Sequence, residues 1–164
     1  MTKTKFFLGI LLSFFVGGAI IHALISKVQA PEATFTTLTG EGINLAAQKG
    51  KVVLVAFWAT TCPGCVHEMP GLIQAYTKFK DRGFVVIAVA MPYDPPSYVL
   101  NFARSRQLPF PVVLDVMGAA MKAFGDVRAT PTSFLIGKDG AIVDQRVGEL
   151  DFNRLDIYLT KELG

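Results

Sequence analysis

The feature that most constrains the fold is a pair of continuous apolar runs, at residues 52–58 and 84–90. Runs of this length without polar alternation are typical of strands buried on both faces, as in the middle of a parallel sheet. Between them, apolar residues recur at helical spacing from Pro63 onward, and proline suits the first turn of a helix. The sequence therefore predicts a strand–helix–strand unit, with Pro70 kinking the helix.

The flanking segments extend this pattern. A short hairpin is expected within residues 31–50, because apolar positions alternate on both sides of the turn Gly40-Glu41-Gly42. Further strands are expected at residues 110–114, 133–136 and 141–147, and further helices from Ser97, Met117 and Asp151, with Ser97 and Asp151 as N-caps. Strands that alternate with helices indicate the α/β class, here a mixed central sheet flanked by helices, and the last two strands add an antiparallel edge.

The N-terminus carries a separate signal. Residues 6–25 contain no formal charge, and a helix of twenty residues spans ~30 Å, the hydrocarbon thickness of a bilayer. Lys3 and Lys5 precede this run, so the positive-inside rule places the N-terminus in the cytoplasm and the rest of the chain on the far side. We expect an N-terminal signal-anchor in residues 1–30 and an exported domain in residues 31–164. The alternative is a signal peptide cleaved near Ala30, which also exports the domain.

Charge and composition exclude several classes of protein. Half of the residues are hydrophobic (51%) and 18% are charged, which excludes a disordered chain. Removing residues 1–30, with their three lysines, leaves 13 basic and 13 acidic residues. The domain is therefore neutral and lacks the basic footprint of a nucleic-acid-binding protein. We expect a monomer without a nucleic-acid partner.

The chain has two cysteines, Cys62 and Cys65, which follow a predicted buried strand and open a predicted helix. Two cysteines do not complete a four-ligand zinc site, which leaves a redox pair, half of a metal site or chance. The partial positive charge of a helix N-terminus favours a thiolate and lowers its pKa. We therefore expect Cys62, at the helix mouth, to be the exposed nucleophile. Cys65, one turn further on, is expected to be buried and to resolve the mixed disulfide.

The residues around this pair resemble a known family. The run Phe57-Trp58-Ala59-Thr60-Thr61-Cys62-Pro63-Gly64-Cys65 is similar to the F-W-A-x-x-C-x-x-C signature of the thioredoxin superfamily. More narrowly, the chain resembles membrane-anchored TlpA/ResA-like thiol–disulfide oxidoreductases, which share a C-x-x-E-x-P pattern with residues 65–70. The resemblance implies a thioredoxin-like fold over about residues 35–163, with the insertion typical of this group at residues 93–115.

The resemblance also implies a role for residues outside the cysteine pair. Pro131 is expected to be cis and to face the cysteines, with the backbone of Thr130 offered to a substrate peptide. Glu68 is expected to accept the proton of Cys65, since it lies three residues further along the same helix face. The alternative for Glu68 is a solvated surface residue.

Two further residues are candidates for the substrate site. Trp58 is expected either to shield the pair and form a docking surface or to pack in the core. Pro63, within the C-x-x-C motif, influences the reduction potential and is counted with the substrate-binding residues.

Three functions follow from the cysteine pair. The first is an exported reductase of specific protein disulfides; the resemblance suggests cytochrome c or copper-site proteins as clients. No cofactor motif is visible, so a membrane thiol donor would have to reduce Cys62–Cys65 again. The second is an oxidase that donates disulfides, and the third is a Cu(I) chaperone that uses the same two thiolates.

Overall fold

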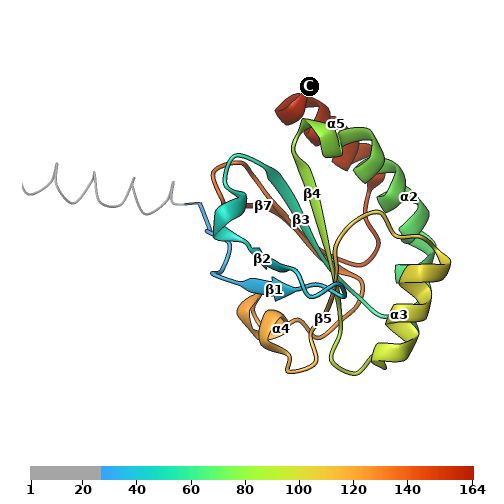
Figure 1. Ribbon diagram of the computed structural model, residues 1–164. Coiled ribbons are helices and arrows are strands. Elements are labelled where there is room, and N and C mark those ends of the chain that lie inside the picture. Colours follow the sequence, from blue (N-terminus) through green and yellow to red (C-terminus); the bar gives the residue numbers. More distant parts are fainter. Residues whose placement is uncertain (1–26) are drawn as a thin grey trace, which may run out of the picture.

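The computed structural model describes residues 27–164 (Figure 1). Its main sheet has five strands in the order β5 (Val112–Leu114), β4 (Phe84–Ala90), β3 (Val52–Trp58), β6 (Thr132–Ile136) and β7 (Ile142–Val147). Strands β3, β4 and β5 are parallel, β6 is antiparallel to β3, and β7 is antiparallel to β6. The mixed central sheet that the sequence predicted is confirmed.

Helices and a hairpin cover the two faces of this sheet. The helices are α2 (Pro63–Phe79), α3 (Pro96–Ser105), α4 (Ala119–Ala123) and α5 (Phe152–Leu163), and short 3-10 turns lie at Ala46–Gln48 and Lys80–Arg82. The predicted hairpin consists of β1 (Thr34–Thr36) and β2 (Gly42–Asn44), which pair antiparallel. Helices α2, α3 and α5 pack on one face, and the hairpin and α4 pack on the other (Figure 1).

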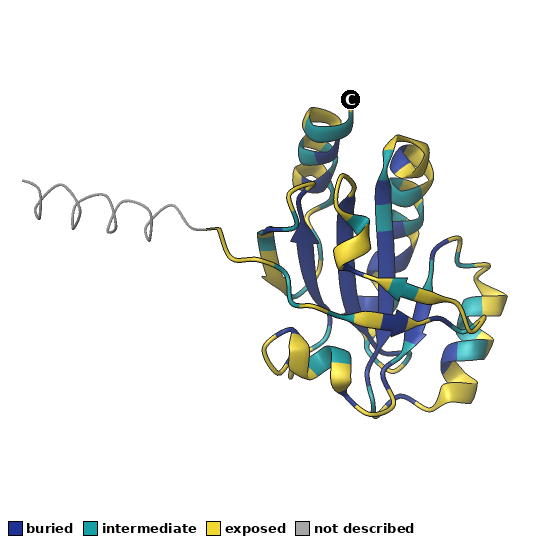
Figure 2. Cartoon of the chain, turned by 60° about the vertical axis from the view of Figure 1, so that its left-hand side comes forward, coloured by how far each residue is buried: buried dark blue, intermediate teal, exposed yellow. Residues whose placement is uncertain are grey.

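Alternation along the central strand explains why its sequence is apolar throughout. Leu54 and Trp58 belong to the core beneath α2, α3 and α5, whereas Val55 and Phe57 belong to the core beneath the hairpin and α4. Successive side chains of a strand point to opposite faces, so a strand covered on both sides needs apolar residues at every position. Figure 2 shows the result: β3 is buried along its whole length, and β4 is buried at every residue except the half-buried Val85.

Two helix starts differ from the prediction. Helix α3 begins at Pro96 with Pro95 as its N-cap, so Ser97 lies in the first turn and the prediction that Ser97 caps the helix was wrong. Proline fixes φ and has no N–H to leave unpaired, which suits this position. Helix α4 begins two residues after Met117 and is held by the buried Asp115, whose carboxylate accepts two backbone N–H groups. The predicted cap at Asp151 is confirmed.

The predicted N-terminal segment, residues 6–25, lies outside the described residues. Within residues 27–164, no helix is both long and apolar enough to cross a membrane. The contacts of the domain begin slightly before the expected boundary at residue 31. Gln29 forms a bridge with Ala141, and the Ala30 N–H donates to the carbonyl of Gly140.

The close packing of α2 against α5 predicts that replacing a helical glycine with alanine lowers the stability of the protein. A Cβ atom at Gly71 would lie 2.6 Å from Cε2 of Phe152. We expect Gly71→Ala to lower the free energy of unfolding by about 1–3 kcal/mol through overpacking. At a solvent-exposed position inside a helix, the same substitution would raise it by ~1 kcal/mol. Urea unfolding of the detergent-solubilised chain, followed by circular dichroism, measures the change.

The partner residue supplies the control. The double variant Gly71→Ala/Phe152→Leu replaces the ring with a smaller side chain, and it should recover part of the stability lost in Gly71→Ala. A Gly71→Ala variant at least as stable as the parent would contradict the close packing of these two helices.

Candidate active site

The two cysteines lie where β3 gives way to α2. Cys62 is the N-cap of α2, with extended backbone, and Cys65 lies in the first turn. Their sulfurs form a disulfide, and the Cys65 N–H donates to the Cys62 Sγ at 3.2 Å. Cys62 is half-buried, whereas Cys65 is fully buried. This is the order of burial that the sequence predicted, and it leaves one sulfur within reach of a large substrate.

A buried acid fixes the turn that leads into Cys62. Both carboxylate oxygens of Asp94 accept hydrogen bonds from Thr60, one from the backbone N–H and one from the hydroxyl, each at 2.6 Å. Asp94 is 4% exposed and lies after β4. The sequence analysis missed this residue. The sequence shows only an acid in the loop after a buried strand, which places it at the carboxyl end of the sheet but does not indicate its contact with Thr60.

The cis-proline lies at the same edge. The Thr130–Pro131 peptide bond is cis, as the resemblance implied. A Cβ atom at Gly64 would lie 3.6 Å from Pro131 Cδ, which places this proline against the C-x-x-C turn. The neighbouring Thr130 hydroxyl lies 3.3 Å from the hydroxyl of the exposed Tyr93. The hydroxyl groups of Thr130 and Tyr93 therefore lie together next to the cis-proline.

Glu68 is buried in the same helix. It is 5% exposed, so the alternative of a solvated surface glutamate was wrong. Its Oε2 accepts a hydrogen bond from the Leu150 N–H at 3.0 Å. Burial raises the pKa of Glu68, and the charge of Glu149 adds to this, while the Leu150 N–H and His67 oppose it. A carboxylate with a raised pKa is suited to accept a proton near neutral pH.

Trp58 and Pro63 lie in different environments. Trp58 is 1% exposed and its ring packs against Phe102, with ring centroids 5.1 Å apart. Its indole N–H is buried without a hydrogen-bond partner in the described part of the chain. The interpretation of Trp58 as a docking surface was therefore wrong, because the side chain is part of the core. Pro63 is exposed at the first position of α2, beside Cys62.

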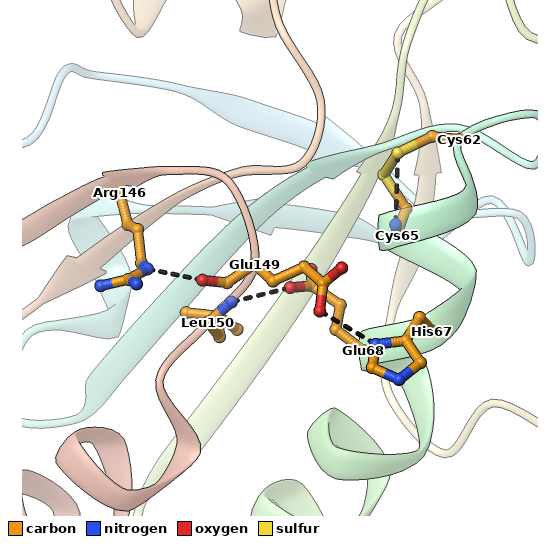
Figure 3. A network of polar contacts seen from close by, with 7 residues as sticks. All are labelled: Cys62, Cys65, His67, Glu68, Arg146, Glu149 and Leu150. Carbon is orange, nitrogen blue, oxygen red and sulfur yellow. Dashed lines mark hydrogen bonds and ion pairs between the residues drawn. A yellow bond between two sulfur atoms is a disulfide. The ribbon is translucent and has the colours of Figure 1, made fainter.

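A second residue that the sequence analysis missed is Glu149, which follows β7. Its carboxylate pairs with Nδ1 of His67 at 2.9 Å, and its backbone carbonyl accepts from Arg146 (Figure 3). The His67 side chain is exposed, and Glu149 is its partner. Since 82 residues separate Glu149 from His67, no local spacing could have indicated the pair.

The disulfide, the cis-proline and the buried carboxylate form one site on the edge of a thioredoxin-like sheet. Among residues 27–164, no group of three or more His, Cys, Asp or Glu side chains is arranged to hold a metal ion. A cysteine pair at a helix N-terminus, with one thiol within reach and the other beneath it, is suited to thiol–disulfide exchange. The fold and the site together define a thiol–disulfide oxidoreductase.

Comparison with known proteins gives the family. The chain belongs to the Redoxin family, whose model matches residues 26–159. Thiol-disulfide oxidoreductase ResA of Bacillus cereus is 36% identical over 159 residues, which cover 93% of this chain and 91% of that protein. ResA of Bacillus subtilis is 34% identical over 130 residues, covering 79% and 72%. A thioredoxin family thiol:disulfide interchange protein from Chlorobium tepidum has a similar structure, with a TM-score of 0.73, 29% identity and coverage of 85% and 98%.

Proposed function

We propose that this protein reduces specific disulfides of exported proteins through Cys62 and Cys65. The observation that carries the proposal is the arrangement of the pair. Cys62 is half-buried at the N-terminus of α2, and Cys65 is buried in the first turn of the same helix, three residues before the buried Glu68. This arrangement suits a large substrate, because only one sulfur has to be reached from outside.

The reaction starts from the reduced dithiol. The Cys62 thiolate attacks one sulfur of the client disulfide, so that a Cys62–client bond forms and the first client thiolate leaves. Cys65 then loses its proton to Glu68 and attacks Cys62 Sγ, which releases the second client thiol. Two electrons pass to the client, and the Cys62–Cys65 disulfide of the described structure is the oxidised product.

The client would bind beside the cis-proline. Thr130 and Pro131 border the C-x-x-C turn, and Pro63 is exposed next to Cys62. We propose that an extended client segment lies along Thr130 while its disulfide reaches Cys62. Apocytochrome c and copper-site proteins are the proposed clients, on the strength of the resemblance to TlpA/ResA-like proteins.

We propose that the domain lies on the outer face of a bacterial inner membrane, with residues 6–25 as its membrane anchor. In the alternative, residues 6–25 belong to a signal peptide that is removed by cleavage near Ala30. A membrane thiol donor would return the protein to its dithiol state. Labelling of Cys62 in intact cells by a membrane-impermeant maleimide tests this location. Labelling only after the membrane is broken would contradict export.

The direction of electron flow is tested by the reduction potential. We expect equilibration with dithiothreitol to give a potential well below the glutathione poise of about −240 mV. Insulin disulfides should be reduced when dithiothreitol recycles the enzyme. A potential of about −120 mV would instead identify a disulfide donor. Retention of Cu(I) without a reversible two-electron couple would identify a copper chaperone.

A further inference from the structure

One short segment contacts both the cis-proline and the helix that carries the cysteines. Residues 148–150, here called the closing turn, connect β7 to α5. The Gly148 N–H donates to the carbonyl of Pro131 at 2.8 Å, and the Leu150 N–H donates to Glu68 Oε2 at 3.0 Å. The two ends of the closing turn are therefore tied to the cis-proline and to the buried carboxylate.

The middle residue ties the same turn to the C-x-x-C helix. Glu149 Oε2 lies 2.9 Å from His67 Nδ1, and a Cβ atom at Gly64 would lie 3.1 Å from Glu149 Oε1. The carboxylate thus lies across the first turns of α2, between the cysteine motif and His67 (Figure 3). A larger residue at position 64 would displace it.

Stability alone does not explain this contact. The side chains of His67 and Glu149 are 79% and 48% exposed, and exposed ion pairs contribute little to the free energy of unfolding. The closing turn also contains Gly148 at φ +101°, a backbone conformation that glycine adopts readily, and glycine has no side chain that could hold the turn at this position. The Glu149 side chain is the contact that joins the middle of the turn to α2.

We propose that Glu149 is a positioning residue of the thiol–disulfide reaction: its pairing with His67 holds the closing turn on α2, so that the Leu150 N–H stays hydrogen-bonded to Glu68 while Cys65 loses its proton. The inference rests on the exchange reaction proposed above and assigns a function to a pair that this reaction does not itself require.

The charges around Glu68 give the direction of the expected effect. The charges that act on Glu68 are His67 from α2 and Glu149 from the closing turn. Arg146 at the end of β7 and Asp151 and Arg154 at the start of α5 are charged residues on the elements that the closing turn joins. The Leu150 N–H lowers the pKa of Glu68 by more than the Glu149 charge raises it. Releasing the closing turn should therefore raise the pKa of Glu68 further, even though a negative charge has been removed.

Reaction of the reduced full chain, in detergent, with 5,5′-dithiobis(2-nitrobenzoate) separates the two thiol steps. Attack by Cys62 releases the first equivalent of thionitrobenzoate, and attack by Cys65 on the mixed disulfide releases the second. In Glu149→Ala we expect the second phase to be about threefold to tenfold slower at pH 7, the range of one lost hydrogen bond, and its pH midpoint to move upward. The first phase should change less.

Four further variants make the test specific. Glu149→Gln, which keeps an acceptor for His67 Nδ1–H, should retain most of the parent rate. The second phase of His67→Ala should be slowed as much as that of Glu149→Ala. The double variant His67→Ala/Glu149→Ala should be no slower than either single variant, because each single substitution already removes the same contact. Asp144→Asn is the matched control, since it breaks the exposed Asp144–Arg154 pair between β7 and α5, away from the cysteines.

The outcomes separate this proposal from the proposed function. A parent protein that releases no second equivalent would overturn the exchange reaction and this inference together. A normal second phase in the parent, with Glu149→Ala indistinguishable from Asp144→Asn in rate and pH midpoint, would overturn the positioning role alone. Equal changes of the first phase in Glu149→Gln and Glu149→Ala, with an unchanged second phase, would also overturn it, because they indicate a charge effect on Cys62.

Discussion

Replacing Cys62 with serine is expected to abolish disulfide exchange, whereas replacing Cys65 with serine should stop the reaction at the mixed disulfide. Cys62 is the sulfur that a substrate can reach, and the fully buried Cys65 can act only on Cys62. Turnover with insulin should fall on the order of 1000-fold or more in both variants, as it does when a nucleophile or its obligatory partner is removed. The two variants should differ in what accumulates.

Mass spectrometry distinguishes them. Cys65→Ser, mixed with a disulfide substrate, should carry one covalent adduct at Cys62 that dithiothreitol removes, and Cys62→Ser should carry none on the same time scale. Thr61→Ser, at the exposed residue before Cys62, is the control and should turn over normally. Adducts at Cys65 in the Cys62→Ser variant, formed as fast as those at Cys62, would reverse the assigned roles.

The architecture could be predicted because burial leaves a clear mark on these strands. β3 and β4 are covered on both faces, so every position is apolar and the runs at residues 52–58 and 84–90 coincide with the strands. Helix starts were less predictable. Ser97 has the side chain of an N-cap, yet the two prolines before it determine where α3 begins. At this position the fixed φ of proline determines the start of the helix, and the N-cap preference of serine does not.

The active site divides along the same line. Residues close to the cysteines in sequence, such as Glu68, could be placed by helical spacing, and Pro131 by the family resemblance. Asp94 and Glu149 could not, because they reach the site through contacts with Thr60 and His67 that span 34 and 82 residues. Such contacts depend on the strand order of the sheet, which brings the ends of β3, β4 and β7 to one edge.

Glu68→Gln is expected to change activity and stability in opposite directions. Without a carboxylate to accept the proton of Cys65, resolution of the mixed disulfide should slow by about 100-fold near pH 7, the scale of general base catalysis, and the pH dependence that Glu68 confers on this step should disappear. The reaction with 5,5′-dithiobis(2-nitrobenzoate) measures the rate. The first phase, attack by Cys62, should be largely retained.

Stability should respond the other way because burial raises the pKa of Glu68 above its ordinary value of 4.5. The folded protein then binds the Glu68 proton more tightly than the unfolded chain does, so this group stabilises the fold at low pH and the contribution is lost as pH rises from about 4.5 through the raised pKa. Glutamine does not ionise, and its carbonyl can still accept from the Leu150 N–H. The stability of Glu68→Gln relative to the parent should therefore increase across this pH range and level off above it.

Urea unfolding of the oxidised protein at several pH values between 4 and 8 measures this difference. Glu41→Gln, on an exposed glutamate of the hairpin turn, is the matched control and should follow the parent at every pH. If Glu68→Gln ran parallel to the parent from pH 4 to 8, the ionisation of Glu68 would be unchanged by folding. A buried carboxylate poised for proton transfer would then be the wrong description of this residue, and the proton of Cys65 would need another acceptor.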